Sequence, residues 1–279
     1  MSKILKIKDI KIFKDDHYNT FPNVIRRQDG TIMLGFRQAP DWQKILVNAP
    51  NKNFGRITHI DPCSKAVYIT SDDDGQTWDD KANVLYDDFV YGVQDPCLNV
   101  IKGDTVLCTF FMWKVFKKRD IKDILPSDRI INNEWIGRTD KAYSIRSFDG
   151  GKTWDEPIGI EYPGCRFFAV RGNAAVLEDG TVVLPVYGDS DFGEPSRIIL
   201  LKTCDLGVTW EKVAVVASLP DYDLVEPNIY KTDSGKLVAF IRSHKRGEKS
   251  VYGPENVELS PLITCESMDN GRTWSDPVK

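Results

Sequence analysis

Alternating apolar and polar residues mark four segments of the chain, and each segment carries a turn signal in its middle. Every segment is 17 residues long, with about half leading to the turn and half leading back. The turns hold Gly beside Asp or Ser, and the flanks are rich in Val, Ile and Leu. The pattern predicts four β-hairpins, at residues 21–37, 95–111, 171–187 and 226–242.

A second repeat occurs after each hairpin and has the form Ser/Thr-x-Asp-x-Gly-x-Thr-Trp. Its four copies are "SDDDGQTW" (71–78), "SFDGGKTW" (147–154), "TCDLGVTW" (203–210) and "SMDNGRTW" (267–274). We expect the Asp carboxylate to accept hydrogen bonds from nearby backbone N–H groups and the Gly to adopt a positive φ. Thr then begins a strand, and Trp fills the gap between neighbouring sheets.

The spacing of this second repeat predicts a radial array of small sheets. Its four Trp residues are 76, 56 and 64 residues apart, a period typical of β-propellers. We expect an all-β fold, a single β-propeller domain with about four four-stranded blades at roughly 14–90, 91–163, 164–220 and 221–279. Because "TWSDPVK" only begins the outer strand of the fourth blade, we expect the ring to be incomplete in this chain.

Composition and charge narrow the classes of function. A chain of 279 residues that is 41% hydrophobic can bury a full core, and a net charge of −4 attracts neither nucleic acid nor an anionic membrane. Lysines interrupt the apolar residues of the N-terminal segment, so we expect no signal peptide, and the sequence contains no apolar run long enough to span a membrane. Its six cysteines lack metal-ligand spacing, so we expect reduced thiols, a cytoplasmic protein, no metal and no cofactor.

The predicted hairpins bring their own two ends together, away from the turn. We expect the second repeat on the face of the hairpin turns, so the hairpin ends converge on the opposite face near the axis. The opening positions are Phe21, Asp95, Arg171 and Glu226, and the closing positions are Arg37, Phe111, Tyr187 and Arg242. Convergence of five charged residues predicts a binding site. A rim of solvated or mutually paired charges is the alternative.

The repeated box resembles the Asp-box (BNR) repeat of sialidases, a family of six-bladed propellers. The resemblance implies an arginine clamp for the substrate carboxylate, an Asp acid/base and a Tyr nucleophile assisted by Glu. "EPNIYKTDSGKLVAFIR" is similar to the segment with that Glu and the second clamp arginine, which implies these roles for Glu226 and Arg242. "THIDPCSKAVYITSDDDGQTW" resembles the segment with the acid/base, which implies Asp61; His59 would lie on the same side of an extended strand and could assist.

The chain departs from the family pattern at the clamp and at the nucleophile. Thr20 of "NTFP" stands where the family has its first clamp arginine, and Arg37 is the candidate to supply that charge from another backbone point. The third arginine and the Tyr nucleophile belong to later blades in the family. Neither Tyr187 nor Tyr222 matches that nucleophile, so Tyr187 joins Arg171 and Asp95 as an expected substrate-binding residue.

These expectations lead to one hypothesis and two alternatives. The hypothesis is a sialidase-like retaining exo-glycosidase, or its N-terminal two-thirds, that hydrolyses terminal acidic sugars without a cofactor. The alternatives are a glycosidase or lyase of other specificity that uses His59 and Tyr187, and a non-catalytic carbohydrate- or protein-binding propeller. The expected partners are a saccharide with a carboxylate, no nucleic acid, no membrane, and a second copy of the chain at exposed blade edges.

Three further segments carry expectations of their own. Residues 38–63 and 112–140 are long for connections, and we expect both to overhang the axial site. The second holds Trp113, Trp135 and the basic run "KVFKKR", which predicts sugar contacts or a lid, with an ordinary surface loop as the alternative. "LKIKDIKIF" near the N-terminus alternates like an edge strand.

Overall fold

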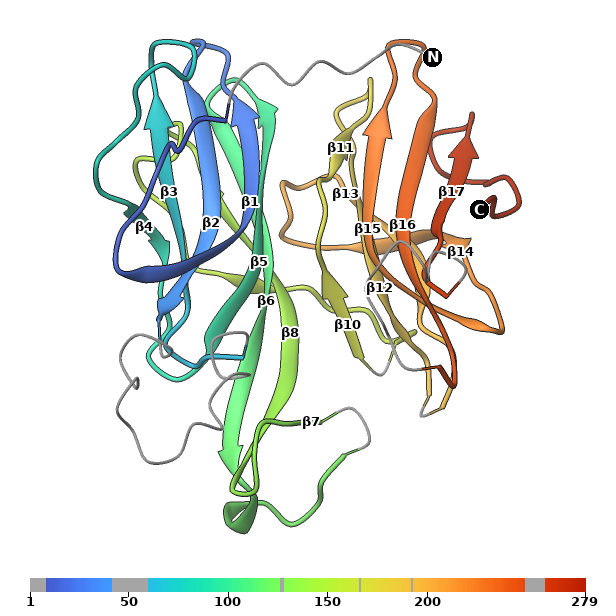
Figure 1. Ribbon diagram of the computed structural model, residues 1–279. Helices are drawn as coiled ribbons and strands as arrows, with labels where there is room; N and C mark the ends of the chain where they lie inside the picture. Colours follow the sequence, from blue (N-terminus) through green and yellow to red (C-terminus); the bar gives the residue numbers. More distant parts are fainter. Residues whose placement is uncertain (1–8, 42–59, 126–127, 166, 192, 249–258) are drawn as a thin grey trace.

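The computed structural model describes residues 9–41, 60–125, 128–165, 167–191, 193–248 and 259–279, and these form four antiparallel sheets (Figure 1). The first sheet, in spatial order, is β1 (His17–Arg26), β2 (Ile32–Pro40), β3 (Lys65–Ser71) and β4 (Asn83–Tyr86). The second contains β5 (Gly92–Lys102), β6 (Thr105–Lys117), β8 (Trp135–Ser147) and β7 (Arg129–Ile130), with β9 (Ile158–Gly159) also paired to β8. A short 3-10 helix, η1 (Lys118–Asp120), follows β6.

The other two sheets repeat the same meander with small changes. In the third sheet the inner strand is split into β10 (Phe167–Val170) and β11 (Ala175–Val176), and β12 (Val182–Asp189), β13 (Arg197–Thr203) and β14 (Glu211–Ala217) follow. The fourth sheet contains β15 (Tyr222–Lys231), β16 (Leu237–Lys245) and β17 (Leu262–Ser267). Among the described residues its outer strand is reduced to one bridge, between Thr264 and Val278.

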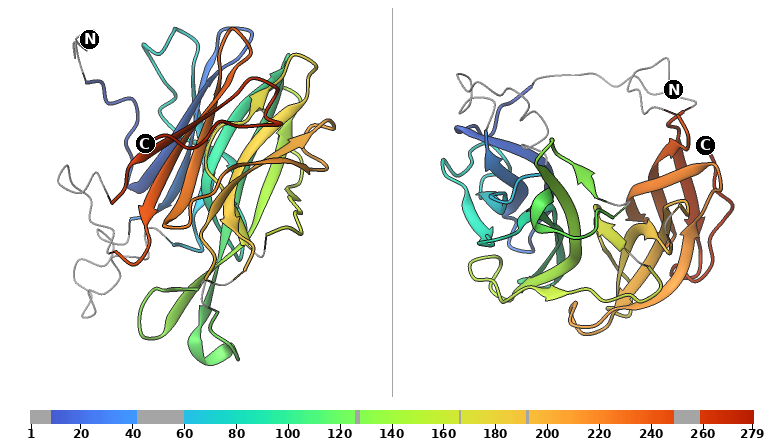
Figure 2. Two further views of the ribbon diagram at one scale, coloured as in Figure 1. Left: turned by 90° about the vertical axis from the view of Figure 1, so that its right-hand side faces the viewer. Right: turned by 90° about the horizontal axis from the view of Figure 1, so that it is seen from below.

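The four sheets follow one another along an arc (Figure 2, right), which is the arrangement of four propeller blades. Side chains of the inner strands join them: the Asn23 amide donates to Asn173 Oδ1 (2.7 Å), and Asn23 Oδ1 accepts from the Leu98 N–H (2.7 Å). The predicted all-β propeller fold is therefore confirmed. The residue numbers at which one blade passes into the next, and the incompleteness of the ring, stay predictions.

The hydrophobic core lies between successive sheets. One cluster joins the first two sheets through residues such as Met33 and Phe110, and a second joins the next pair through Phe111 and Leu184. A third cluster, with Leu200 and Leu237 among its members, lies between the last two sheets. Each blade is thus stabilised by the apolar area that it buries against its neighbour.

The outward face of the fourth sheet is partly apolar. Tyr230, Phe240 and Leu262 are 59%, 42% and 58% exposed. On the first sheet, in contrast, the Phe13 ring packs 5.4 Å from the Phe36 ring and covers part of the outward face. Association of copies through such a face stays a prediction.

The Asp box has the same geometry in all four copies. In the first, Asp73 Oδ1 accepts from the Thr77 N–H (2.8 Å), Asp73 Oδ2 accepts from the Thr77 hydroxyl (2.6 Å), and the Trp78 indole donates to the Gly75 carbonyl (3.0 Å). The four box glycines have φ between 83° and 92°, and three of the Trp rings (Trp154, Trp210 and Trp274) pack between sheets. One expectation is wrong: Thr begins no strand, because its side chain closes the turn on the Asp.

The box carboxylates predict how stability depends on pH. The hydroxyl and N–H of Thr77 hold the pKa of Asp73 at about 2, below its usual 3.8. Because the pKa of Asp73 is lower in the folded protein than in the unfolded chain, its ionised carboxylate stabilises the fold at pH values above the unfolded pKa. This stabilisation is lost as pH falls from about 4 to 2. We expect Asp73→Asn to lower the melting temperature by roughly 2–5 °C at pH 7 and by less at pH 2.5. The test is calorimetry at pH 7 and pH 2.5, with exposed Asp233→Asn as the control. An equal fall in melting temperature at both pH values contradicts a stabilising role of the ionised Asp73 carboxylate.

The boxes and the hairpin turns lie at one end of the propeller, as predicted. The Thr31 hydroxyl in the first hairpin turn donates to Asp72 (2.8 Å), and the Gly150 N–H in the second box donates to the Asp104 carbonyl (2.9 Å). The ends of the hairpins therefore lie at the opposite end, which we call the axial end.

The segment 112–140 is an extended hairpin rather than a loop. β6 and β8 pair from Val106–Ser147 out to Lys117–Trp135, and β7 adds to the outer part of β8. This arm extends beyond the other sheets at the axial end (Figures 1 and 2). Trp113 is buried in the core, while the Trp135 ring lies 5.2 Å from Lys117 Nζ.

Two other expectations concern the N-terminus and the first long segment. The described part of "LKIKDIKIF", residues 9–13, forms no strand, whereas residues 1–8 and 42–59 lie outside the described residues.

All six cysteines are free thiols, and Cys97, Cys108 and Cys265 are buried in strands as predicted. In the described part of the chain, no helix is long and apolar enough to cross a membrane.

Candidate functional site

The inner strand of each blade is irregular at the point where its hairpin opens. The pairing of β1, β5 and β15 shifts register there, and the residue before Pro adopts a left-handed conformation: Phe21 (φ 57°), Asp95 (φ 51°) and Glu226 (φ 50°). Residues other than Gly rarely adopt this conformation, and a bulge turns a side chain away from the regular alternation. Three of the opening positions that hairpin length predicts therefore coincide with a bulge and a left-handed backbone conformation.

Because of the bulges, three closing positions pair with the residue before the opening position and not, as predicted, with the opening position itself. Arg37, Phe111 and Arg242 pair with Thr20, Gln94 and Val225, each of which precedes the opening position. In the third blade the strand breaks at Arg171–Gly172 instead. A Cβ atom on Gly172 would lie 1.9 Å from the Pro227 carbonyl oxygen, so only glycine fits where the third blade meets the fourth.

Asp95 and Arg171 come from neighbouring blades and form an ion pair. Arg171 Nη1 lies 3.1 Å from Asp95 Oδ1, and the guanidinium also lies 4.7 Å above the Phe21 ring of the first blade. Asp95 is buried, and its burial raises the pKa to about 6, although the Arg171 guanidinium opposes that rise. Three of the four opening positions thus meet in direct contact.

Glu226 and Arg242 form a second ion pair within the fourth blade. Arg242 Nη1 lies 2.8 and 2.9 Å from the two carboxylate oxygens of Glu226. Glu226 acts electrostatically on Asp95 and Tyr187, which places this pair beside the first. His244, which the sequence analysis did not single out, lies two residues after Arg242 on the same face of β16. Its burial, and then the Arg242 charge, lower the pKa of its imidazole.

Arg37 and Asp61 are both buried, and their charges interact with each other. Arg37 is fully buried and its Nε donates to the Val93 carbonyl (3.1 Å). Burial lowers the pKa of Arg37 to about 10, with the charges of Asp61 and Asp95 opposing the change, so Arg37 stays protonated at neutral pH. Asp61 is also buried and its Oδ1 accepts from the Cys63 N–H (2.7 Å).

Tyr187 lies on β12 beside the same charged groups. Burial raises the pKa of its phenol, and the charges of Asp95 and Glu226 raise it further. The hydroxyl therefore stays protonated at neutral pH and is not a ready phenolate nucleophile. Phe111, the remaining closing position, is buried in the core against Trp113. His59 lies outside the described residues.

The structure thus brings seven of the eight predicted site residues to the axial end: Arg37, Asp61, Asp95, Arg171, Tyr187, Glu226 and Arg242. Sequence reasoning missed two residues nearby, His244 and the arm residue Arg129, which acts electrostatically on Tyr187. Strand alternation after Arg242 could have found His244. Finding Arg129 required knowing the path of the arm.

The raised pKa of Asp95 gives a prediction that needs no substrate. We expect the Asp95 carboxyl to titrate near pH 6 by carboxyl ¹³C NMR. Arg171→Gln removes the cation that favours the ionised form, so we expect this variant to raise the Asp95 pKa further. Titration of wild-type Asp95 near pH 4, or an unchanged value in the variant, contradicts the burial and pairing described above.

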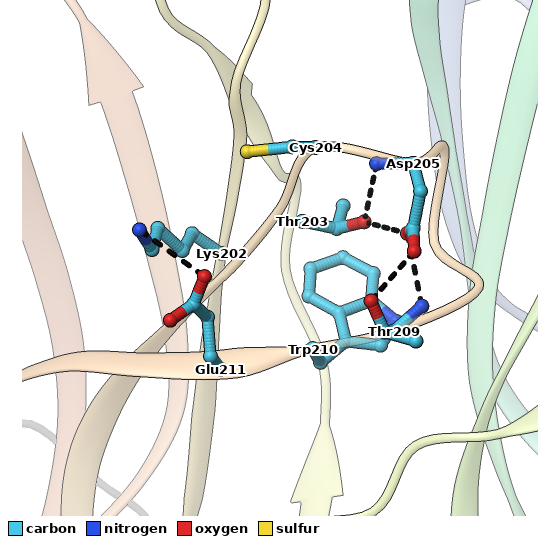
Figure 3. A pocket seen from close by; sticks show the side chains of 7 residues that line it. All are labelled: Lys202, Thr203, Cys204, Asp205, Thr209, Trp210 and Glu211. Atoms are coloured by element: carbon cyan, nitrogen blue, oxygen red, sulfur yellow. Dashed lines mark hydrogen bonds and ion pairs between the residues drawn. The ribbon is translucent and has the colours of Figure 1, made fainter.

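A separate cavity of about 280 Å³ lies at the third Asp box, at the end opposite to the axial site. Its lining residues are Lys202, Thr203, Cys204, Asp205, Thr209, Trp210 and Glu211 (Figure 3). The Asp205 carboxylate is held by the Thr203 and Thr209 hydroxyls (2.7 and 2.6 Å), and Cys204 points away from that turn. Because these polar groups already close the turn, we assign the cavity to the fold. No cluster of His, Cys, Asp and Glu that could hold a metal occurs among the residues with described positions.

Comparison with known proteins supports a propeller of sialidase type. A family profile described as "BNR repeat-like domain" matches residues 130–279. A structure of a protein of unknown function from Dyadobacter fermentans is similar over 99% of this chain and 72% of its own, with 26% identity and a TM-score of 0.79. A search of curated proteins finds no match.

Two enzymes of known class share the fold at lower identity. The intramolecular trans-sialidase from Ruminococcus gnavus, in complex with oseltamivir carboxylate, is 13% identical over 94% of this chain and 70% of its own, with a TM-score of 0.62. Trypanosoma rangeli sialidase is 19% identical over 93% of this chain, with a TM-score of 0.59, and this chain spans 38% of its length. At these identities the likeness concerns the fold alone.

Proposed function

This chain belongs to the family of BNR repeat-like domains, and we propose that it is a sialidase-like exo-glycosidase, or the part of one, that acts on terminal acidic sugars. One observation carries the proposal: the ion pairs Asp95–Arg171 and Glu226–Arg242 lie at the axial end, where the buried Arg37 interacts with both Asp61 and Asp95. Carboxyl and guanidinium groups at close quarters are suited to bind sugar hydroxyls and carboxylates and to move protons.

We assign the roles of the two catalytic carboxyl groups from the resemblance of their segments to the sialidase pattern. Asp61, as the acid, donates its proton to the glycosidic oxygen as that bond to the anomeric carbon breaks. Glu226 accepts a proton from the nucleophile as the nucleophile bonds to the anomeric carbon. A water molecule then displaces the nucleophile: Asp61 takes a proton from that water, and Glu226 returns its proton to the departing nucleophile. We assign no residue of this chain as the nucleophile, because neither Tyr187 nor Tyr222 matches the position of the family's nucleophile.

A non-catalytic saccharide-binding propeller is the second candidate. It is favoured by the internal pairing of the charged groups, since both Arg171 and Arg242 already contact a carboxylate. Groups that are paired before binding can hold a sugar by hydrogen bonds without taking part in its hydrolysis.

Two measurements on the purified chain separate these functions. We expect release of 4-methylumbelliferone from its α-sialoside and no release from the matching α-glucoside or α-galactoside. Ligand-observed NMR with N-acetylneuraminic acid measures binding independently. Binding without release supports the second candidate and overturns the first, whereas neither binding nor release overturns both.

A further inference from the structure

Gln94 is a buried amide beside the bulge of the second blade. It directly precedes Asp95 on β5 and is only 1% exposed. Neighbouring residues of a regular strand point to opposite faces of the sheet, so their side chains do not meet. The left-handed φ of Asp95 (51°) breaks this alternation, and Gln94 Nε2 donates to Asp95 Oδ1 (3.3 Å). The bulge therefore brings the two side chains together.

The backbone at Gln94 is held by the strand and by buried side chains. Gln94 pairs with β6, and the preceding residue, Val93, is fully buried. The Val93 carbonyl accepts from Arg37 Nε (3.1 Å) and from the Ser64 hydroxyl (2.7 Å). Because the backbone is fixed here, the amide approaches Asp95 from one defined direction.

The two oxygens of the Asp95 carboxylate differ in their partners. Oδ1 accepts from Gln94 Nε2 and also from Arg171 Nη1 (3.1 Å), which belongs to the third blade. Oδ2 accepts from no donor in the described part of the chain. The Arg171 side chain is 31% exposed, so a ligand can reach this pair. Two donors on Oδ1 fix the orientation of the carboxylate and leave Oδ2 available to accept from a ligand.

The fold itself gains little from an amide at this position. Gln94 Oε1 is buried and has no hydrogen-bond partner among the described residues, and such an atom destabilises the folded state. The residues directly before the opening positions of the third and fourth blades are Val170 and Val225, and Val170 is fully buried. An apolar side chain thus suits this position of a blade. Packing does not explain the amide, whereas its contact with Asp95 does.

We propose that Gln94 is a positioning residue, which together with Arg171 orients the Asp95 carboxylate so that Oδ2 faces a bound saccharide. The saccharide in this inference rests on the function proposed above, whereas the contact with Asp95 does not. An amide suits the role because its N–H donates to an ionised carboxylate, and after rotation its carbonyl accepts from a protonated one. Since burial raises the pKa of Asp95 to about 6, both forms of this carboxyl group occur near neutral pH.

The test replaces Gln94 with methionine, which has a similar shape but no N–H, and with valine, as in the other two blades. Gln38→Met is the control, because Gln38 is also buried and its Nε2 donates to a different carboxylate, Asp15 (2.8 Å). Carboxyl ¹³C NMR follows the titration of Asp95. In both Gln94 variants we expect Asp95 to titrate at a pH about 0.5 or more above that of wild type, because the ionised form loses a donor. Gln38→Met should leave this titration unchanged.

Melting temperature and saccharide binding are measured on the same proteins. Gln94→Met should melt no lower than wild type and should bind N-acetylneuraminic acid about threefold more weakly or worse, by ligand-observed NMR. A lower melting temperature contradicts the argument that the fold gains little from the amide. An unchanged Asp95 titration in both Gln94 variants overturns the positioning role.

The two readouts also separate this inference from the function on which it rests. A shifted titration with unchanged affinity shows that Asp95 does not face the saccharide, and the inference is then wrong. If wild type binds no saccharide, the proposed function and the ligand of this inference fail together. The titration, which needs no ligand, decides independently whether Gln94 holds Asp95.

Discussion

Replacing Gly92 with alanine will destabilise the protein by about 3 kcal/mol or more and displace the turn that holds Asp61. A Cβ atom at position 92 would lie 1.7 Å from the Asp61 carbonyl oxygen and 2.7 Å from Ser64 Oγ. The nearest atom belongs to the backbone, so no rotation of a side chain can relieve the contact. Overpacking of this kind costs several kcal/mol when the backbone must move. Thermal unfolding should show a fall on the order of 10 °C.

Gly159→Ala is the matched control for this prediction, and the thiol of Cys63 reports on the turn that holds Asp61. A Cβ on Gly159 meets nothing closer than 3.5 Å, so Gly159→Ala should change stability by no more than about 0.5 kcal/mol. Cys63, which is exposed and donates its N–H to Asp61, reports on the turn itself. In a Cys204→Ser background we expect Cys63 to react faster with a thiol reagent in Gly92→Ala. Equal stability and equal thiol reactivity in the two alanine variants would falsify the close packing at Gly92.

The Asp boxes could be predicted in near-atomic detail because each is closed within eight residues. Asp73 and Gly75 perform the roles expected from their types, since hydrogen bonding and positive φ are local properties. Thr77 was misassigned because β propensity and turn closure compete for the same residue. Here the short hydrogen bond between its hydroxyl and Asp73 is formed instead of a strand.

The axial site was predictable only in outline. Equal hairpin lengths predict that the opening and closing positions meet, and Asp95, Arg171, Glu226 and Arg242 do so. The bulges at Asp95 and Glu226 interrupt the regular alternation of side chains, and the local sequence pattern did not predict them. Hairpin length also says nothing about burial, so it could not show that Arg37 would be fully buried.

The arm shows a different kind of error, since its signal was present in the sequence. "WKVFK" and "WIGRT" at residues 113–117 and 135–139 are both rich in aromatic and β-branched residues, which are enriched in strands. Treating the segment as a loop hid this register and with it the position of Arg129. Once Lys117 pairs with Trp135, the return of the chain places β7 over the axial end.

The other large effect expected is on turnover by the two carboxyl groups at the axial end. Asp61→Asn and Glu226→Gln should each reduce kcat/KM for an α-sialoside by about 10²- to 10⁴-fold, as the loss of a proton-transferring group does. Both substitutions preserve shape, because each amide oxygen remains an acceptor, for the Cys63 N–H in the first variant and for Arg242 in the second. Glu211→Gln, at the separate cavity of the third box, is the matched control and should leave turnover unchanged.

The identity of the leaving group separates the two roles. An acid that protonates the glycosidic oxygen matters most when the departing alcohol is a poor leaving group, such as lactose in sialyllactose, and less for an aryl alcohol. Asp61→Asn should therefore lose much more activity on sialyllactose than on the 4-methylumbelliferyl sialoside. Glu226→Gln, which acts on the nucleophile, should lose activity to a similar extent on both substrates. If Asp61→Asn shows no such difference, Asp61 is not the acid and its buried carboxylate serves only to hold the turn at Cys63.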